Sequence, residues 1–250
     1  MKIYISEATK MKLLTIGNSF SQNSTRYLPA ICEEAGVPLT IGRCVIGGCS
    51  LERHWNNANN DTPAYGNAYD GEKTMREMLE SDEWDVVTMQ QASHFSWRIG
   101  TYEPFFSNLV EYVKAHAPKA EIVIQQTWAY RRDNTRLTEE YFISQDQMFM
   151  LLKQNYQAMA DKVGARLMPV GEAYRIHQLI SGDEIGELTR NPDGPSHANR
   201  LGEFIGAMIW ANVLCGIELD KISFIPEEVD PAAVPLAKAA AKAALAMYRK

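Results

Sequence analysis

Short apolar runs alternate with longer amphipathic stretches along this chain, and that alternation constrains the fold more than any other feature. The apolar runs are bounded by turn residues and are too short to be helices. They predict five strands, at residues 13–16, 39–46, 86–89, 122–124 and 166–170. Helical periodicity occurs around residues 25–35, 72–80, 103–116, 143–163, 198–214 and 232–248. Strand and helix in repeated succession predict an α/β fold of three layers, with helices on both faces of a five-stranded parallel sheet.

Small or polar residues follow four of the expected strands in succession. They are Ser19, Gly48, Gln90 and Gln126. Loops are polar in most proteins, so each residue alone carries little information. In parallel sheets, however, ligands bind beyond the carboxyl ends of the strands. The pattern therefore predicts a polar crevice at this edge of the sheet.

The length and charge of the chain limit its organisation and its partners. A chain of 250 residues can form one α/β domain with a full core. We expect one domain over residues 1–250, with an N-terminal extension at 1–10 and a C-terminal helix at 231–250. The 25 basic and 31 acidic residues give a net charge of −6, which argues against nucleic-acid and anionic-membrane partners. The oligomeric state stays open.

The chain also lacks the usual signals for a membrane span, a leader or a metal. No apolar run approaches the roughly 20 residues of a membrane-spanning helix. Residues 1–10 lack the apolar core of a signal peptide, so a cytoplasmic location is the default, with the periplasm open if the chain is a trimmed mature form. The histidines show no HExxH or paired spacing. Neither a metal nor another cofactor is therefore expected.

The turn Gly17-Asn18-Ser19 follows the first expected strand and is a candidate site for a nucleophile. A serine here can point its hydroxyl into the crevice, with backbone N–H groups facing a developing oxyanion. Serine at a strand-to-helix turn is more commonly a helix N-cap. The residues by themselves leave both interpretations of Ser19 open.

A second candidate element lies near the other end of the chain. Asp193 and His197 stand close together in a turn-rich loop that leads into a helix. A serine nucleophile needs a base to take its proton and an acceptor to orient that base. Each residue alone could be an ordinary loop residue, but an early serine and a late Asp–His pair together favour hydrolytic chemistry.

These elements, in this order, resemble the SGNH (GDSL-type) serine hydrolases. The resemblance extends from about residue 11 to residue 216 and rests on the early Gly-Asn-Ser turn, the glycine after the second strand, the polar residue after the third and the late Asp–His pair. Within that family the chain is similar to a bacterial branch with some likeness to sialate-acetylesterase-like members. Residues 47–55, 84–87, 90–93 and 127–129 carry the likeness to this branch.

The resemblance implies a catalytic triad. Ser19 stands at the position of the family's nucleophile, His197 at that of the general base, and Asp193 at that of the orienting acid. Asn18 replaces the aspartate that usually precedes the nucleophile. The acid and the base are spaced D-x-x-x-H, whereas the family usually has D-x-x-H. A Ser–His dyad therefore stays open as the alternative.

The resemblance also implies an oxyanion hole and a substrate-binding set. The backbone N–H groups of Ser19 and Gly48 would be two oxyanion donors. The third would be the side-chain amide of Gln90, with Gln91 as the alternative, because the family's usual asparagine motif is absent. Three further side chains are expected to bind substrate: Asn18, Gln91 and Trp128.

The resemblance and the aromatic loops together favour one function. We expect a serine esterase that hydrolyses short-chain esters, with an acetyl group on a carbohydrate as the expected substrate. A thioesterase or lysophospholipase with the same site is one alternative. A non-catalytic carbohydrate-binding relative is the other. Acyl-chain preference separates the first alternative from the esterase, and turnover separates the second.

Overall fold

The computed structural model describes residues 10–66, 71–189 and 196–248, and it confirms the three-layer α/β/α architecture. All strand pairs in these residues are parallel, and the sheet order is β2-β1-β3-β4-β5. The strands are β1 (Met11–Gly17), β2 (Leu39–Val45), β3 (Val86–Met89), β4 (Glu121–Gln125) and β5 (Arg166–Met168). The same order is found in flavodoxin-like folds.

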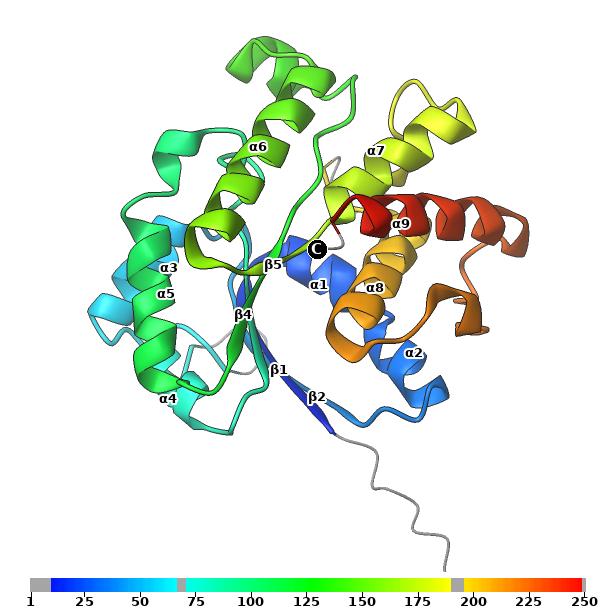
Figure 1. The fold of residues 1–250 in the computed structure, drawn as a ribbon. Helices are drawn as coiled ribbons and strands as arrows, with labels where there is room; N and C mark the ends of the chain where they lie inside the picture. Colours follow the sequence, from blue (N-terminus) through cyan, green and yellow to red (C-terminus); the bar gives the residue numbers. More distant parts are fainter. Residues whose placement is uncertain (1–9, 67–70, 190–195, 249–250) are drawn as a thin grey trace, which may run out of the picture.

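Helices cover both faces of this sheet (Figure 1). One layer contains α3 (Leu51–Asn59), α4 (Met75–Glu80), α5 (Phe105–His116) and α6 (Gln145–Val163). The other layer contains α1 (Ser19–Thr25), α2 (Leu28–Glu34), α7 (Val170–Ser181), α8 (Arg200–Cys215) and α9 (Val234–Tyr248). No helix among the described residues is long and apolar enough to cross a membrane.

The central strands are buried on both faces, which explains why they are continuous apolar runs in the sequence. Leu13 and Leu14 point to opposite faces of β1, and neither is exposed to solvent. Val86 and Val87 of β3 are buried in the same way. Because both faces are covered, the carboxyl edge of the sheet is where polar side chains from these strands gather.

The structure differs from the sequence-based expectations at several helices and at one strand. Helices α3 and α7 were not expected, and β5 ends at Met168 because Val170 already begins α7. The expected helix at 25–35 begins at Leu28, since α1 occupies residues 19–25. The C-terminal helix runs from Val234 to Tyr248 rather than from residue 231, where a short 3₁₀ turn precedes it.

Candidate active site

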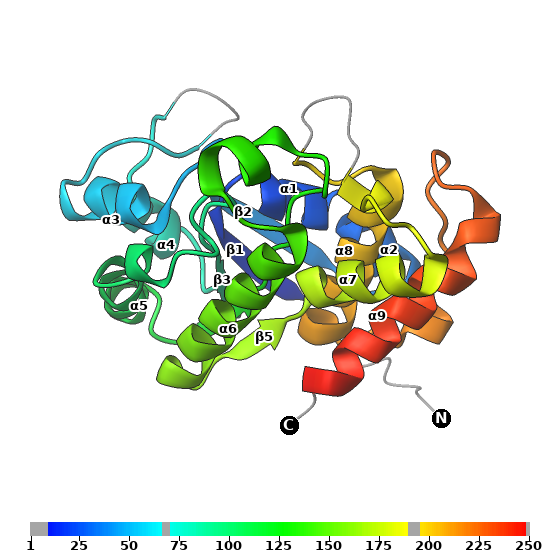
Figure 2. The same ribbon diagram turned by 90° about the horizontal axis from the view of Figure 1, so that it is seen from above.

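The candidate site lies where the direction of strand addition reverses. Strand β1 pairs with β2 on one side, with Gly17 opposite Val45, and with β3 on the other, with Ile16 opposite Met89. The segments that follow these three strands therefore meet at one point of the sheet edge, which is the ligand-binding position in open α/β sheets. Figure 2 shows α1 at this edge, directly after β1.

Ser19 and His197 are brought into contact although 178 positions separate them in the chain. Ser19 Oγ lies 2.8 Å from His197 Nε2, and both residues are half-buried. The N-cap of α1 is Asn18, whose Oδ1 accepts a hydrogen bond from Phe20 N at 3.0 Å. The cap interpretation of Ser19 is therefore wrong, because its neighbour performs that role and leaves the Ser19 hydroxyl to His197.

The segment that carries His197 is held from two sides. The indole N–H of Trp128 donates to the carbonyl oxygen of Ser196 at 2.9 Å, and Asn134 Nδ2 donates to Ser196 Oγ at 3.3 Å. Two residues beyond His197, the side chain of Asn199 caps α8 by accepting from Gly202 N. The histidine is thus fixed between a hydrogen-bonded neighbour and a capped helix. Asp193 lies outside the described residues.

Trp128, which was expected to bind substrate, is buried in the structure. Only 1% of its surface is exposed. Its ring stacks on Phe20 at a centroid distance of 4.1 Å and on Tyr174 at 4.8 Å. Phe20 in turn contacts the His197 ring edge-on, at 5.8 Å between centroids. Aromatic neighbours therefore pack against the Trp128 ring, and its indole N–H supports the segment that carries His197.

Asn18 is also enclosed, with 2% of its surface exposed. Its Nδ2 donates to the carbonyl oxygen of Cys49 at 3.1 Å, and its Oδ1 accepts from Gln90 Nε2 at 2.7 Å as well as from Phe20 N. The side chain therefore ties the segments after β2 and β3 to the turn that carries Ser19. Asn18 thus has a buried linking role, and its expected contact with substrate stays a prediction.

The two glutamines after β3 point in different directions, as the alternation of a strand requires. Gln90 points toward the nucleophile turn, where its Oε1 is buried and has no hydrogen-bond partner among the described residues. Gln91 Oε1 accepts from Leu51 N and Ala92 N, and its Nε2 donates to Thr101. Gln91 thus joins α3 to the following loop, and its amide has no capacity left for substrate.

Gly48 occupies a turn that exposes its backbone. Cys49 N donates to Ile46 O at 3.1 Å across this turn, and Gly48 has a φ of +61°, which favours glycine. A Cβ at Gly48 would meet no atom within 4 Å. Within the described part of the chain, no acceptor pairs with the N–H of Gly48 or of Ser19. No group of three metal-binding side chains occurs in that part either.

His54 is a buried residue of the site that the sequence-based expectations did not include. Its Nε2–H donates to the carbonyl oxygen of Gly17 at 3.0 Å, and Tyr65 OH donates to its Nδ1 at 2.9 Å. Burial lowers the pKa of His54 to about 4, so the ring is neutral at pH 7. The spacing of Leu51, His54 and Ala58 along α3 was the available signal, because it places all three on one helix face.

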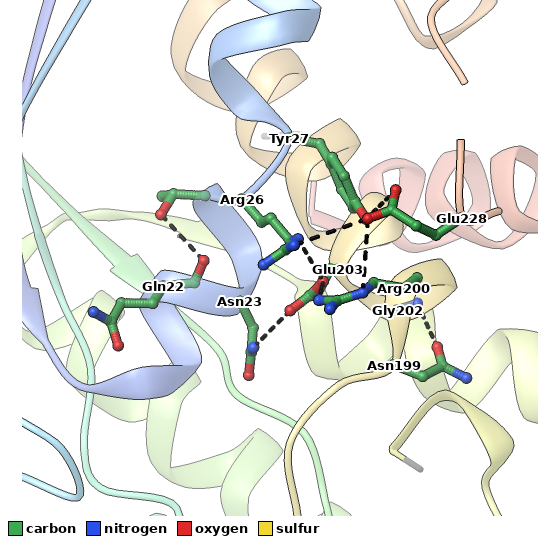
Figure 3. A network of polar contacts seen from close by, with 10 residues as sticks. Gln22, Asn23, Arg26, Tyr27, Asn199, Arg200, Gly202, Glu203 and Glu228 are labelled. Atoms are coloured by element: carbon green, nitrogen blue, oxygen red, sulfur yellow. Dashed lines mark hydrogen bonds and ion pairs between the residues drawn. The ribbon is translucent and has the colours of Figure 1, made fainter. Parts of the chain in front are cut away.

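A polar network between α1 and α8 sets the spacing of the helices that flank Ser19 and His197 (Figure 3). Its centre is Glu203 of α8, which is 2% exposed. The carboxylate accepts from Asn23 Nδ2 at 2.9 Å and Arg200 Nη1 at 2.8 Å, and lies 3.3 Å from Arg26 Nε. Two guanidinium groups and an amide thus stabilise this buried charge, as burial of a carboxylate requires.

Solved structures with the same fold include SGNH hydrolases. A DUF4886 family protein from Bacteroides uniformis superposes with a TM-score of 0.85 at 28% identity, over 95% of each chain. A candidate SGNH hydrolase from Slackia heliotrinireducens gives 0.59 at 24%, over 82% of this chain and 98% of that one. The acetyl xylan esterase AlAXEase gives 0.58 at 14%, over 81% and 100%.

The last two likenesses are below 25% identity and establish the fold, which is that of SGNH hydrolases. None of the curated proteins matches the chain. The family model described as "Domain of unknown function (DUF4886)" matches residues 12–244. Because this match covers nearly the whole chain, the protein belongs to the DUF4886 family.

Proposed function

We propose that this protein is a serine esterase in which Ser19 is the nucleophile and His197 the general base. The observation that carries the proposal is the 2.8 Å contact between Ser19 Oγ and His197 Nε2. This distance lies within the range through which a base can take the hydroxyl proton. The SGNH-hydrolase fold supports the same reaction class, as does the position of both residues at the ligand-binding edge of the sheet.

The first half of the reaction forms an acyl-enzyme. His197 Nε2 takes the proton of Ser19 Oγ while the oxygen attacks the ester carbonyl carbon, and the carbonyl oxygen becomes an oxyanion. The tetrahedral intermediate then collapses and breaks the bond to the alcohol oxygen. That oxygen leaves with the proton held by His197. In the second half, water attacks the acyl-enzyme with His197 as base, and the acid and free Ser19 are released.

Three donors would stabilise the oxyanion. The backbone N–H groups of Ser19 and Gly48 belong to adjacent strand ends and have no other acceptor in the described chain. Gln90 Nε2 uses one hydrogen on Asn18 and keeps a second, which we assign to the oxyanion. Each such donor contributes about 3 kcal/mol to transition-state stabilisation. Asp193 would orient His197 through Nδ1.

For the substrate, we propose a short acyl ester, an acetyl group on a carbohydrate. Half-buried aromatic residues at this edge of the sheet, Phe95 and Tyr141, offer ring surfaces to a sugar. Among the proteins that share the fold, AlAXEase is an acetyl xylan esterase.

Hydrolysis of 4-nitrophenyl acetate tests the reaction class. We expect turnover by the wild type and a loss of at least about 10³-fold in kcat for Ser19→Ala and for His197→Ala. Ser107→Ala is the matched control, because Ser107 lies on α5 and donates to Glu103. It should retain wild-type activity. Circular dichroism confirms that each variant is folded.

Three results would count against the proposal in different ways. Equal turnover by Ser19→Ala and wild type would show that another residue is the nucleophile. Turnover that increases from acetate to octanoate esters would favour a thioesterase or lysophospholipase over an acetyl esterase. Sugar binding without turnover of acetylated xylo-oligosaccharides or 4-nitrophenyl acetate would favour a carbohydrate-binding protein.

A further inference from the structure

A second feature at the carboxyl edge of the sheet is an open cleft of about 410 Å³. Two segments form it, the loop after β3 and the π-helical turn Arg136–Tyr141 that follows β4. We call it the basic cleft and define it by its lining residues, His94, Phe95, Arg98, Arg136, Glu140 and Tyr141. Its volume is in the range of small-ligand sites.

The charges in the basic cleft are unbalanced toward positive. It contains two guanidinium groups and one carboxylate, in a chain whose net charge is −6. Arg136 Nε lies 3.6 Å from Glu140 Oε1, so one of the two arginines is paired. Within the described residues no carboxylate pairs with Arg98, whose guanidinium lies 4.5 Å from the centroid of the Trp97 ring and 5.7 Å from that of Tyr141. These rings hold the cation without neutralising it.

His94 adds no positive charge to the basic cleft at neutral pH. Burial lowers its pKa, and the neighbouring charges of Arg136 and Arg98 lower it further. The groups facing the cleft are therefore a neutral imidazole, two cations, one carboxylate and the rings of Phe95 and Tyr141. This is a combination of anion-binding donors and flat apolar surfaces.

The basic cleft is bonded to the segment that carries His197. Arg136 N donates to Asn134 Oδ1 at 3.0 Å, and Asn134 Nδ2 donates to Ser196 Oγ at 3.3 Å. One buried side chain thus joins the wall that carries Arg136 to the residue before His197. A hydrogen bond between Ser93 Oγ and Tyr130 OH, at 2.9 Å, joins the loop after β3 to the segment after β4. The basic cleft therefore lies at the same edge of the sheet as Ser19, and it is joined by hydrogen bonds to the segment that carries His197.

We propose that the basic cleft binds an anionic group of the substrate, so that the protein acts on acylated acidic saccharides. Arg98 and Arg136 would bind the oxyanions of that group, since guanidinium groups pair with carboxylate or sulfate through two parallel hydrogen bonds. Phe95 and Tyr141 would pack against the sugar ring. The role in substrate selection rests on the esterase function proposed above, whereas binding of the acidic sugar does not.

Matched substrates test the selection. An acetylated oligogalacturonide is compared with the same compound after methyl esterification, which removes the charge and keeps the acetyl groups. The ratio of kcat/KM for the charged to the neutral substrate should fall at least about tenfold in Arg98→Gln and in Arg136→Gln, as expected when one charge-assisted hydrogen bond is lost. Arg132→Gln is the control, because Arg132 is exposed in the same segment and does not line the cleft. An unchanged ratio in both cleft variants would overturn the proposal.

Binding is measured separately by titration calorimetry on the Ser19→Ala variant, which does not depend on turnover. The probes are an unacetylated oligogalacturonide, a sulfated oligosaccharide of the same length and a neutral one. Binding of either anionic probe that is lost in Ser19→Ala/Arg98→Gln supports the cleft and identifies carboxylate or sulfate as the group. If neither anionic probe binds more tightly than the neutral one, the cleft proposal is wrong. Arg98-dependent binding by a wild type without esterase activity would overturn the proposed function alone.

Discussion

Trp128 and Ser196 are joined by a hydrogen bond of 2.9 Å between the indole N–H and the backbone carbonyl, one residue before His197. The indole is enclosed between Phe20 and Tyr174, so the bond starts from a side chain that has little freedom to move. The base of the proposed reaction is therefore positioned by a buried tryptophan. The position of His197 relative to Ser19 depends on that packing.

Replacing Trp128 with phenylalanine should keep most of the stack and remove the hydrogen bond. We expect kcat to fall about tenfold with KM little changed, because a small misplacement of a catalytic group is costly and Trp128 is not placed on substrate. Trp210→Phe is the matched control. Its indole N–H is buried without a partner in the described chain, so the variant loses volume and no such bond. Steady-state kinetics with equal kcat for the two variants would contradict the positioning role.

Replacing Asn18 with alanine should destabilise the protein by about 3 kcal/mol. The change removes the N-cap of α1 and leaves Gln90 Nε2 buried without its acceptor. Ser50→Ala is the control, because it removes a side-chain cap on α3 and should cost only about 1 kcal/mol. Urea unfolding gives both values. Equal losses for the two variants would mean that Asn18 is only a helix cap.

Replacing Gly206 with alanine tests the close approach of α1 and α8. A Cβ at Gly206 would lie 3.0 Å from Ser24 Cα and Oγ. Overpacking costs about 1–3 kcal/mol, while the higher helix propensity of alanine returns up to about 1 kcal/mol. We therefore expect a net loss of about 1 kcal/mol in the free energy of unfolding, together with a lower kcat. Gly100→Ala, whose Cβ would meet no atom within 4 Å, should lose neither. A Gly206→Ala variant more stable than wild type would show that α1 and α8 can move apart at little cost in free energy.

The stability of the protein should depend on the protonation of His54. Burial lowers its pKa to about 4 in the folded state, whereas the unfolded chain has a value near 6.5. Below pH 6.5 the unfolded chain therefore binds more protons, and stability decreases as the pH falls toward 4. Above pH 7 the contribution of His54 to the free energy of unfolding is constant. About 3 kcal/mol of that contribution is lost when the pH falls below the folded-state pKa. Urea unfolding at pH 7.5 and pH 5 should show a smaller difference in His54→Gln than in wild type. The same difference in both proteins would contradict this role of His54.

The strands were predictable from the sequence, whereas helices α1, α3 and α7 were not. The central strands are buried on both faces, so they require apolar residues at consecutive positions, and such runs are visible without a structure. The inward face of α3 includes His54, which is polar as a residue type and is buried only because Gly17 O and Tyr65 OH satisfy it. Helix α7 was missed because Val170, its first residue, continues the apolar run of β5.

The resemblance to SGNH hydrolases selected Ser19 and His197 as partners, because the residues by themselves left the role of Ser19 open. Their 2.8 Å separation exists only in the folded chain, where α1 and α8 pack together around Glu203. The functions of Gln90 and Gln91 could not be separated in sequence, since a one-residue change of register exchanges the directions of two adjacent strand residues. Trp128 looked like a ligand-binding residue in sequence because residue type does not report burial. Local pattern thus determined the strands and, together with the resemblance, the candidate reactive residues, and tertiary packing decided which polar and aromatic side chains are buried as supports of the site.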